Sequence, residues 1–191
     1  MPPLSNVVGF DDAPFARSHR GDVLLVGAVC ARTRLDGVLS TRVRRDGANA
    51  TTKMIEVVTR SQFGGHLQAV LLQGIAVAGF NVVDVSELSR QLQVPVLVVA
   101  RKRPDLASMR RALMGMEARG GPGAARKWDL IERAGPMEPL GGLWVQRIGL
   151  SRSEAGELLR GTTLHGALPE AIRLAHLIAG GVTTGVSRGR A

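Results

Sequence analysis

The chain has 191 residues, 45% of them hydrophobic and 21% charged, and its 25 Lys and Arg outnumber its 16 Asp and Glu, for a formal net charge of +9. This balance predicts one globular domain over residues 1–191 and excludes a disordered chain. No run approaches about 18 consecutive apolar residues, which excludes a transmembrane helix. The lone Cys30 excludes an internal disulfide framework, and the N-terminus lacks the basic region of a secretory signal, so we expect a cytoplasmic protein that does not bind membranes.

The apolar and β-branched runs of the N-terminal half predict a meander of three strands joined by short turns, followed by alternating helices and strands. The predicted strands are 6–10, 22–32, 38–45, 67–72 and 94–100. The predicted helices are 50–63, which Gly64-Gly65 ends, and 82–92, with Ser86 as the N-cap. An apolar, glycine-bounded loop spans 73–81.

The C-terminal half predicts mainly helices. They cover 106–116, 128–133, 151–159 and 169–178, and Ser151 with Glu154 forms a capping box at the start of the third. We expect an exposed loop over 119–125 and a last edge strand over 143–148. The Gly-, Thr- and Arg-rich tail 180–191 is predicted to be a flexible loop unless a ligand orders it.

This order of elements is that of the ribonuclease H-like α/β fold, in which a mixed five-stranded sheet has helices on both faces. Carboxylates in that fold gather at the end of the first strand, on the first helix and at the end of the fourth strand.

The excess of basic residues favours a polyanionic partner, most simply a nucleic acid. Lysine supplies only Lys53, Lys102 and Lys127 of the 25 basic residues, so a general compositional bias towards arginine is an alternative explanation. Aromatic residues are 3% of the chain and Tyr is absent, which disfavours a platform of rings for base stacking. Nothing in the sequence indicates an obligate protein partner.

The acidic pair Asp11-Asp12 ends the first predicted strand. Two adjacent carboxylates in a low dielectric repel each other unless a cation lies between them, and Mg²⁺ and Mn²⁺ prefer such oxygen ligands. The pair therefore predicts a divalent-metal site, while the alternative is that one aspartate merely caps the next turn.

Further candidates carry weaker signals. Asp46 precedes the first helix, but Asp46-Gly47 is also a common turn sequence. Asp84 is either a carboxylate of the site or simply the residue before a helix. Gly74 and Gly79 would let the backbone approach a ligand closely. The basic run Arg101-Lys102-Arg103 follows the fifth strand and suits a phosphate, although charge runs are often only solvated. His176, alone on the last helix, is assigned a structural role.

Five segments together resemble the family once called domain of unknown function 99, now associated with endonuclease dU. They are Gly9-Phe10-Asp11-Asp12, Leu35-Asp36-Gly37-Val38-Leu39, Asp46-Gly47-x-x-Ala50-Thr51, Gly79-Phe80-Asn81-Val82-Val83-Asp84 and Val99-Ala100-Arg101-Lys102-x-Pro104-Asp105. The region 148–175 is similar, more distantly, to endonuclease V. The resemblance implies a ribonuclease H-like fold, a divalent metal, and cleavage of DNA near a deaminated base such as deoxyuridine.

Carried over to this sequence, the resemblance implies that Asp11 binds the metal and that Asp46 opens the segment that supplies the second carboxylate. Asp12, Asp46 and Asp84 could help Asp11 to hold the ion. Lys102 would neutralise a phosphate, and Asp11, Asp46 and Lys102 would form the catalytic set. The substrate-binding residues would be Gly74, Gly79, Phe80, Asn81 and Arg101.

Two positions depart from the family pattern, because Asn49 and Gln73 are neutral amides where acidic residues are common. Two fewer carboxylates weaken metal binding. The sequence therefore leaves three functions open: a metal-dependent endonuclease, a nucleic-acid-binding protein on the same fold that has lost its catalytic activity, or a protein whose arginines bind RNA or another anionic partner.

Overall fold

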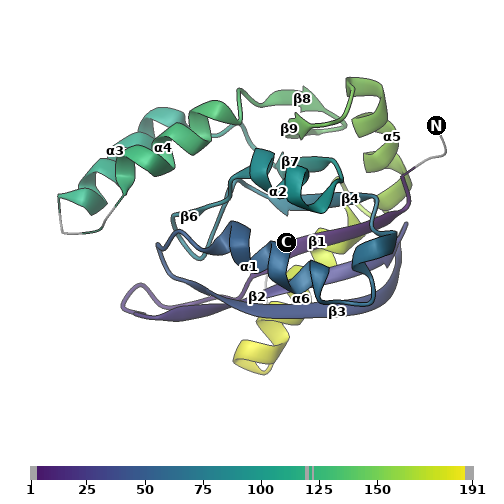
Figure 1. Cartoon of the computed structure of the whole chain (residues 1–191), viewed down its shortest axis with the longest axis horizontal. Coiled ribbons are helices and arrows are strands. Elements are labelled where there is room, and N and C mark those ends of the chain that lie inside the picture. The colour runs from purple at the N-terminus through teal and green to yellow at the C-terminus, as the bar shows by residue number, and fades with distance from the viewer. Residues whose placement is uncertain (1–3, 119–120, 122, 188–191) are drawn as a thin grey trace.

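The computed structural model describes residues 4–118, 121 and 123–187. Within them, seven strands form one mixed sheet in the order β3-β2-β1-β4-β7-β9-β8 (Figure 1). Their bounds are β1 Asn6–Asp12, β2 Asp22–Ala31, β3 Arg34–Arg44, β4 Ala69–Gln73, β7 Val96–Ala100, β8 Glu138–Leu140 and β9 Leu143–Ile148. The neighbours β1, β4 and β7 run parallel, and the outer strands pair antiparallel.

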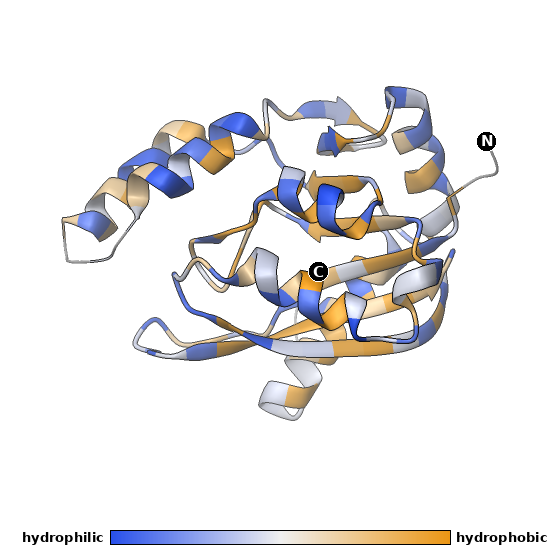
Figure 2. Cartoon of the chain, in the orientation of Figure 1, coloured by the Kyte–Doolittle hydropathy of each residue, from blue (hydrophilic) through white to orange (hydrophobic). Residues whose placement is uncertain are grey.

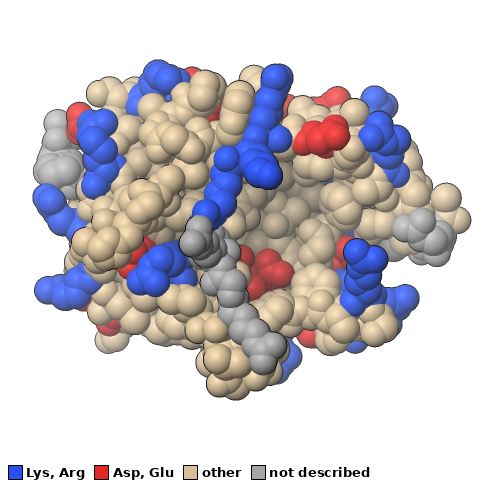
Figure 3. Space-filling model, turned by 180° about the vertical axis from the view of Figure 1, so that it is seen from behind, with Lys and Arg blue, Asp and Glu red and all other residues tan. Residues whose placement is uncertain are grey.

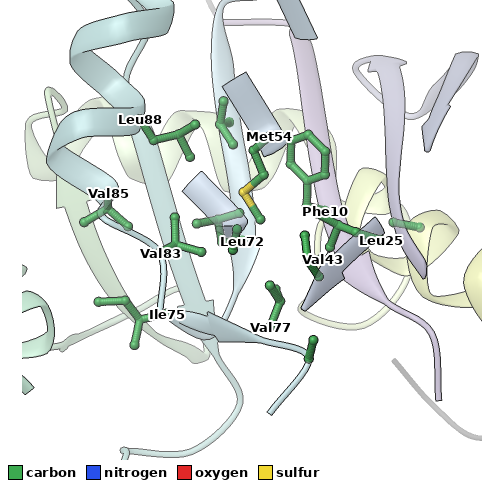
Figure 4. Close-up of a cluster of buried hydrophobic side chains, with 14 of the residues drawn as sticks. Phe10, Leu25, Val43, Met54, Leu72, Ile75, Val77, Val83, Val85 and Leu88 are labelled. Carbon is green, nitrogen blue, oxygen red and sulfur yellow. The ribbon is translucent and has the colours of Figure 1, made fainter. Parts of the chain in front are cut away.

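Helices cover both faces of this sheet, as the alternation of side chains along β1 shows. Phe10 points to one face and packs in a cluster with Met54 of α1 (Ala50–Thr59) and Leu88 of α2 (Val85–Leu92) (Figure 4). Val7 points to the other face, into a cluster with Leu158 of α5 (Arg152–Thr162) and residues of α6 (Glu170–Thr184). Apolar residues concentrate in the strands between these layers, and polar residues lie on the outer faces of the helices (Figure 2).

Gly9 sets the distance between β1 and α6. A Cβ atom at Gly9 would lie 2.5 Å from the backbone of Ala171 and of Ile172, so any side chain there would force the helix outward. Asp11 is two residues further along β1 and therefore faces the same helix, one turn beyond this contact. The close approach at Gly9 thus brings the α6 side chains within reach of Asp11.

Two helices, α3 (Leu106–Glu117) and α4 (Ala124–Arg133), pack against each other and extend away from the sheet, at the upper left of Figure 1. The guanidinium of Arg110 on α3 lies 5.5 Å from the ring centroid of Trp128 on α4. Lys127 of α4 is almost fully buried and donates a hydrogen bond to the carbonyl oxygen of Asp46, which ties the helix pair to the body.

The expected α/β class with a mixed sheet is confirmed, but the five-stranded sheet is wrong. The sheet continues through β9 to β8, so 143–148 is not an edge strand as predicted. The short strand β8 could not be predicted from the sequence, because its three residues include Pro139 and have no alternating pattern.

Other boundaries also differ. The predicted loop 73–81 contains a small hairpin of β5 (Ala76–Val77) and β6 (Asn81–Val82), and the short 3-10 helix η1 (Gly64–His66) follows α1. Asp84, not Ser86, is the N-cap of α2. The final helix continues to Thr184, so the predicted loop 180–191 is helical in its first part, and 188–191 lie outside the described residues. The predicted loop 119–125 is also partly outside them, and Ala124 already begins α4.

Candidate active site

Asp11 and Asp12 end β1 beside the end of β4, because the two strands are parallel and in register, with Phe10 opposite Leu72. Gln73 is the last residue of β4. The three side chains line an open cavity of about 690 Å³ whose other wall includes His176 and Thr184 of α6. The space-filling view shows a hollow on this side of the molecule with acidic side chains at its lower edge (Figure 3).

His176 contacts Asp11 directly. Its Nδ1 lies 2.7 Å from Asp11 Oδ2, a hydrogen bond that the imidazole donates when Asp11 is ionised. Only 15% of the Asp11 side chain is exposed, and 30% of the His176 side chain. His176 thus makes a structural hydrogen bond, and its partner is one member of the acidic pair in the cavity.

Burial makes both carboxylates weaker acids than usual. The pKa of Asp11 is raised by desolvation, and the hydrogen bond and charge of His176 partly offset this. The pKa of Asp12 is raised to about 6, first by desolvation and then by the negative charge of Asp11, while hydrogen bonding with the backbone of Ala78 opposes the shift. Two buried carboxylates with raised pKa values are typical of functional sites, where a bound cation relieves the repulsion.

Gln73 adds a neutral oxygen to this cavity. Its Oε1 is buried and has no hydrogen-bond partner, which is costly for a buried polar atom unless a ligand satisfies it. Within the described part of the chain, no group of three or more His, Cys, Asp or Glu is arranged to hold a metal ion. The donor set that fits a hard cation is therefore two carboxylates, Asp11 and Asp12, completed by the amide oxygen of Gln73.

Asp46 organises a turn beside this cavity and does not line it. Its backbone is left-handed, with φ +52°, and its Oδ1 accepts a hydrogen bond of 2.8 Å from the Phe80 N–H. Arg45 Nε lies 3.2 Å from its Oδ2. A Cβ at Gly79 would lie 2.3 Å from Asp46 Oδ1, so glycine is required there for this contact. These contacts give Asp46 a role in positioning the 78–80 segment, in place of the predicted contact with a metal.

Asp84 and Asn81 have structural contacts of their own. Asp84 Oδ1 accepts a 2.9 Å hydrogen bond from the Glu87 N–H at the start of α2, and it lines a different cavity from Asp11. Asn81 is completely buried: its Oδ1 accepts from the Ala50 N–H at 3.0 Å, and its Nδ2 donates to Arg44 O and Asn49 Oδ1, both at 2.8 Å. The predicted contact of Asn81 with substrate is wrong, because this side chain holds β3, α1 and β6 together.

The remaining predicted residues lie around the same edge of the sheet. Lys102 and Arg101 are exposed and follow β7, whose C-terminal end lies on the same edge as those of β1 and β4. Gly74, with φ +75°, lines a narrow cavity of about 200 Å³ together with Ile75 and Gln146. Gly79 and Phe80 line a separate groove beside α3.

The contribution of the C-terminal half of α6 to the cavity was not expected from the sequence. The segment compared with endonuclease V ended one residue before His176, and the tail containing Gly180 and Thr184 was predicted as loop. The available signal was the spacing of Ala171, Ala175 and Ala179, which lie four residues apart and are all buried. This spacing continues the helix beyond residue 178 and keeps His176 and Gly180 on one face.

Comparisons with known proteins agree with this arrangement. The model of the family described as "Endonuclease dU" matches residues 3–183. A UPF0215 protein of Deinococcus radiodurans is 56% identical over 189 residues, which cover 99% of this chain and 94% of that relative. A crystal structure from Archaeoglobus fulgidus is similar with a TM-score of 0.85 and 31% identity, covering 95% of this chain and 99% of that one.

More distant structures share the fold. Endonuclease V of Ciona intestinalis, solved in complex with a 24mer DNA that contains an inosine followed by a ribo-adenosine, has a TM-score of 0.55 and 14% identity, covering 90% of this chain and 82% of that one. The fold is thus an α/β fold with a mixed sheet similar to that of endonuclease V. By the match over nearly its whole length, the chain belongs to the Endonuclease dU family.

Proposed function

We propose that this protein is a metal-dependent endonuclease that cuts DNA containing deaminated bases of the deoxyuridine type. The observation that carries the proposal is the buried pair Asp11 and Asp12, which lines an open cavity together with Gln73, a residue whose buried Oε1 has no hydrogen-bond partner. The family match and the net charge of +9 support a polyanionic substrate, and the DNA complex of the distant endonuclease V structure supports DNA.

Asp11, Asp12 and Gln73 would hold Mg²⁺ or Mn²⁺, which supplies an activated water and neutralises charge on the phosphate. The hydrogen bond from His176 fixes the orientation of the Asp11 carboxylate and favours its ionised form, against the desolvation that raises its pKa. Lys102, on the same edge of the sheet, would pair with a phosphate oxygen of the bound strand.

The 200 Å³ cavity beside Gly74 is the site we assign to the displaced base. It is lined mainly by apolar side chains from α3, α4 and the segment before β8, among them Met109, Ile131 and Met137. Such a narrow apolar cavity would accept a base that has left the stack.

The second candidate function is that of a DNA-binding protein that has lost its catalytic activity. Gln73 favours it, because an amide contributes no negative charge where an acidic residue would bind the metal more tightly. Asn49 also favours it, because its Oδ1 accepts hydrogen bonds from the Arg44 N–H and from Asn81, and so serves the fold.

Cleavage of labelled oligonucleotides that carry one deoxyuridine or one deoxyinosine separates the two functions. The nuclease predicts incision at or beside the lesion with Mn²⁺ or Mg²⁺, none with EDTA, and none by Asp11→Asn although that variant still binds the DNA. Incision by Asp11→Asn at the wild-type rate would refute the site, and binding without incision under any of these conditions would establish the second candidate.

A further inference from the structure

A groove of about 740 Å³ lies between α3 and the end of β3, separate from the carboxylate cavity. Four arginines line it, from three segments that are distant in sequence: Arg20 before β2, Arg44 and Arg45 at the end of β3, and Arg111 on α3. Asp46 is the acidic residue among its described lining residues, and Arg45 and the Phe80 N–H already engage its carboxylate. The groove is therefore strongly positive. We call it the arginine groove.

The arginine groove adjoins the carboxylate cavity. Phe15 lines that cavity, and the guanidinium of Arg45, which lines the groove, lies 5.3 Å from the centroid of the Phe15 ring. Arg45 is fixed in this position because it donates hydrogen bonds to the carbonyl oxygens of Arg17 and His19. The Phe15–Arg45 pair is thus a shared wall, and a polymer bound at Asp11 can continue past it into the groove.

The other three arginines have donors available for a ligand. Arg44 Nη1 lies 3.4 Å from Asp22 Oδ1, Arg111 Nη2 donates to Ser108 Oγ at 2.7 Å, and Arg20 Nη1 donates to the His19 carbonyl at 3.2 Å. Each of these contacts engages one nitrogen of a guanidinium that carries five N–H donors in a fork suited to phosphate. All three residues are exposed.

The form of the groove favours an extended polyanion. Three segments supply its charges along one channel, and Phe80 supplies the aromatic ring among its described lining residues. One ring is too few for a stacking platform, so the contacts suit the phosphates of a strand more than its bases.

We propose that the arginine groove binds the sugar–phosphate backbone of DNA on one side of the cleavage site, through Arg20, Arg44 and Arg111. This inference rests on the proposed function for the identity of the polymer. It adds a binding surface that extends the substrate beyond the lesion, and it predicts that the enzyme needs DNA on one flank of the lesion.

The first test is the salt dependence of binding to a deoxyuridine oligonucleotide, measured in EDTA to prevent incision. Arg20→Gln, Arg44→Gln and Arg111→Gln should each weaken binding about three- to tenfold, and each should reduce the slope of log K against log salt by about one. The matched control is Arg42→Gln, since Arg42 is an exposed arginine of the same strand as Arg44 and does not line the groove. Groove variants that behave like this control would overturn the inference.

The second test extends the oligonucleotide stepwise on either flank of the lesion. Wild-type affinity should rise with length on one flank only, and the triple variant of Arg20, Arg44 and Arg111 should lose that gain. An affinity gain that is equal on both flanks, or that the triple variant keeps, would refute the proposed role of the groove. These readouts do not depend on incision. If the wild type cleaves the DNA and the groove variants bind it as tightly as the wild type does, the proposed role of the groove is refuted and the nuclease function is not. If the groove variants bind more weakly than the wild type but the wild type does not cleave, the nuclease function is refuted and the role of the groove is not.

Discussion

Replacing Asp12 by Asn should make the protein more stable at neutral pH while removing a metal ligand. In the folded chain the pKa of Asp12 is raised from 3.8 to about 6, so the ionised carboxylate is disfavoured there relative to the unfolded chain. A shift of this size corresponds to about 3 kcal/mol of unfolding free energy at pH values above both pKa values. An amide at this position keeps the shape of the side chain and removes the buried charge.

The sign of the pH dependence follows from the raised pKa. As the pH falls from about 7 to about 4, the folded state takes up a proton on Asp12 while the unfolded state is still largely ionised, so the wild type gains stability relative to Asp12→Asn. Urea denaturation followed by circular dichroism should give an advantage of about 2–3 kcal/mol for the variant at pH 8, falling towards zero at pH 4.

The control is Asp129→Asn on α4, whose side chain is 62% exposed and pairs with Arg133, and which should change stability by less than about 0.5 kcal/mol at any pH. Added Mn²⁺ should stabilise the wild type and not Asp12→Asn. A variant no more stable than the wild type at pH 8, or an advantage that does not decrease with pH, would refute the reasoning that burial and the charge of Asp11 destabilise the ionised Asp12.

Two further substitutions test how the fold supports the site. Gly9→Ala should lower the unfolding free energy by about 1–3 kcal/mol and abolish incision, because the new methyl group displaces α6 and with it His176. The control is Gly65→Ala, because nothing lies within 4 Å of the added Cβ. Equal melting temperatures for these two variants would contradict the prediction. Asn81→Ala should cost about 2–4 kcal/mol in chemical denaturation, because it leaves the buried Ala50 N–H without its partner. An unchanged denaturation midpoint would show that the hydrogen bonds of Asn81 do not hold β3, α1 and β6 together.

The central sheet was predictable because its strands are nearly continuous apolar runs. The segment around Leu71 is buried on both faces, as a central parallel strand must be, and its pattern needs no partner to be recognised. β8 was not predictable in this way, because its pairing with β9 depends on tertiary contacts rather than on its own three residues.

For the site, the sequence predicted the acidic pair and could not predict its neighbours. Asp11 and Asp12 follow an apolar strand and so were recognisable, but the contact between Asp11 and His176 joins residues 165 positions apart. In the sequence the carboxylates of Asp46 and Asp84 were weaker candidates than the acidic pair, because Asp46 also suits a turn and Asp84 also suits the position before a helix. The fold uses them to hold a turn and to cap a helix, which depends on the Phe80 and Glu87 N–H groups that the structure places beside them.

The edge position of β3 has a consequence for the behaviour of the protein at high concentration. This strand has 11 residues and pairs only with β2 in the described sheet. Apart from Arg44, whose N–H and carbonyl bond to Asn49 and Asn81, its outer side is an edge with which a second copy of the chain could pair. Arg34, Arg42 and Arg44 are exposed along it, and the register with β2 shifts between Val29 and Cys30. We expect the positive charge along this strand, which Asp36 and Asp22 offset in part beside Arg34 and Arg44, to oppose edge-to-edge pairing of two chains and so to disfavour aggregation.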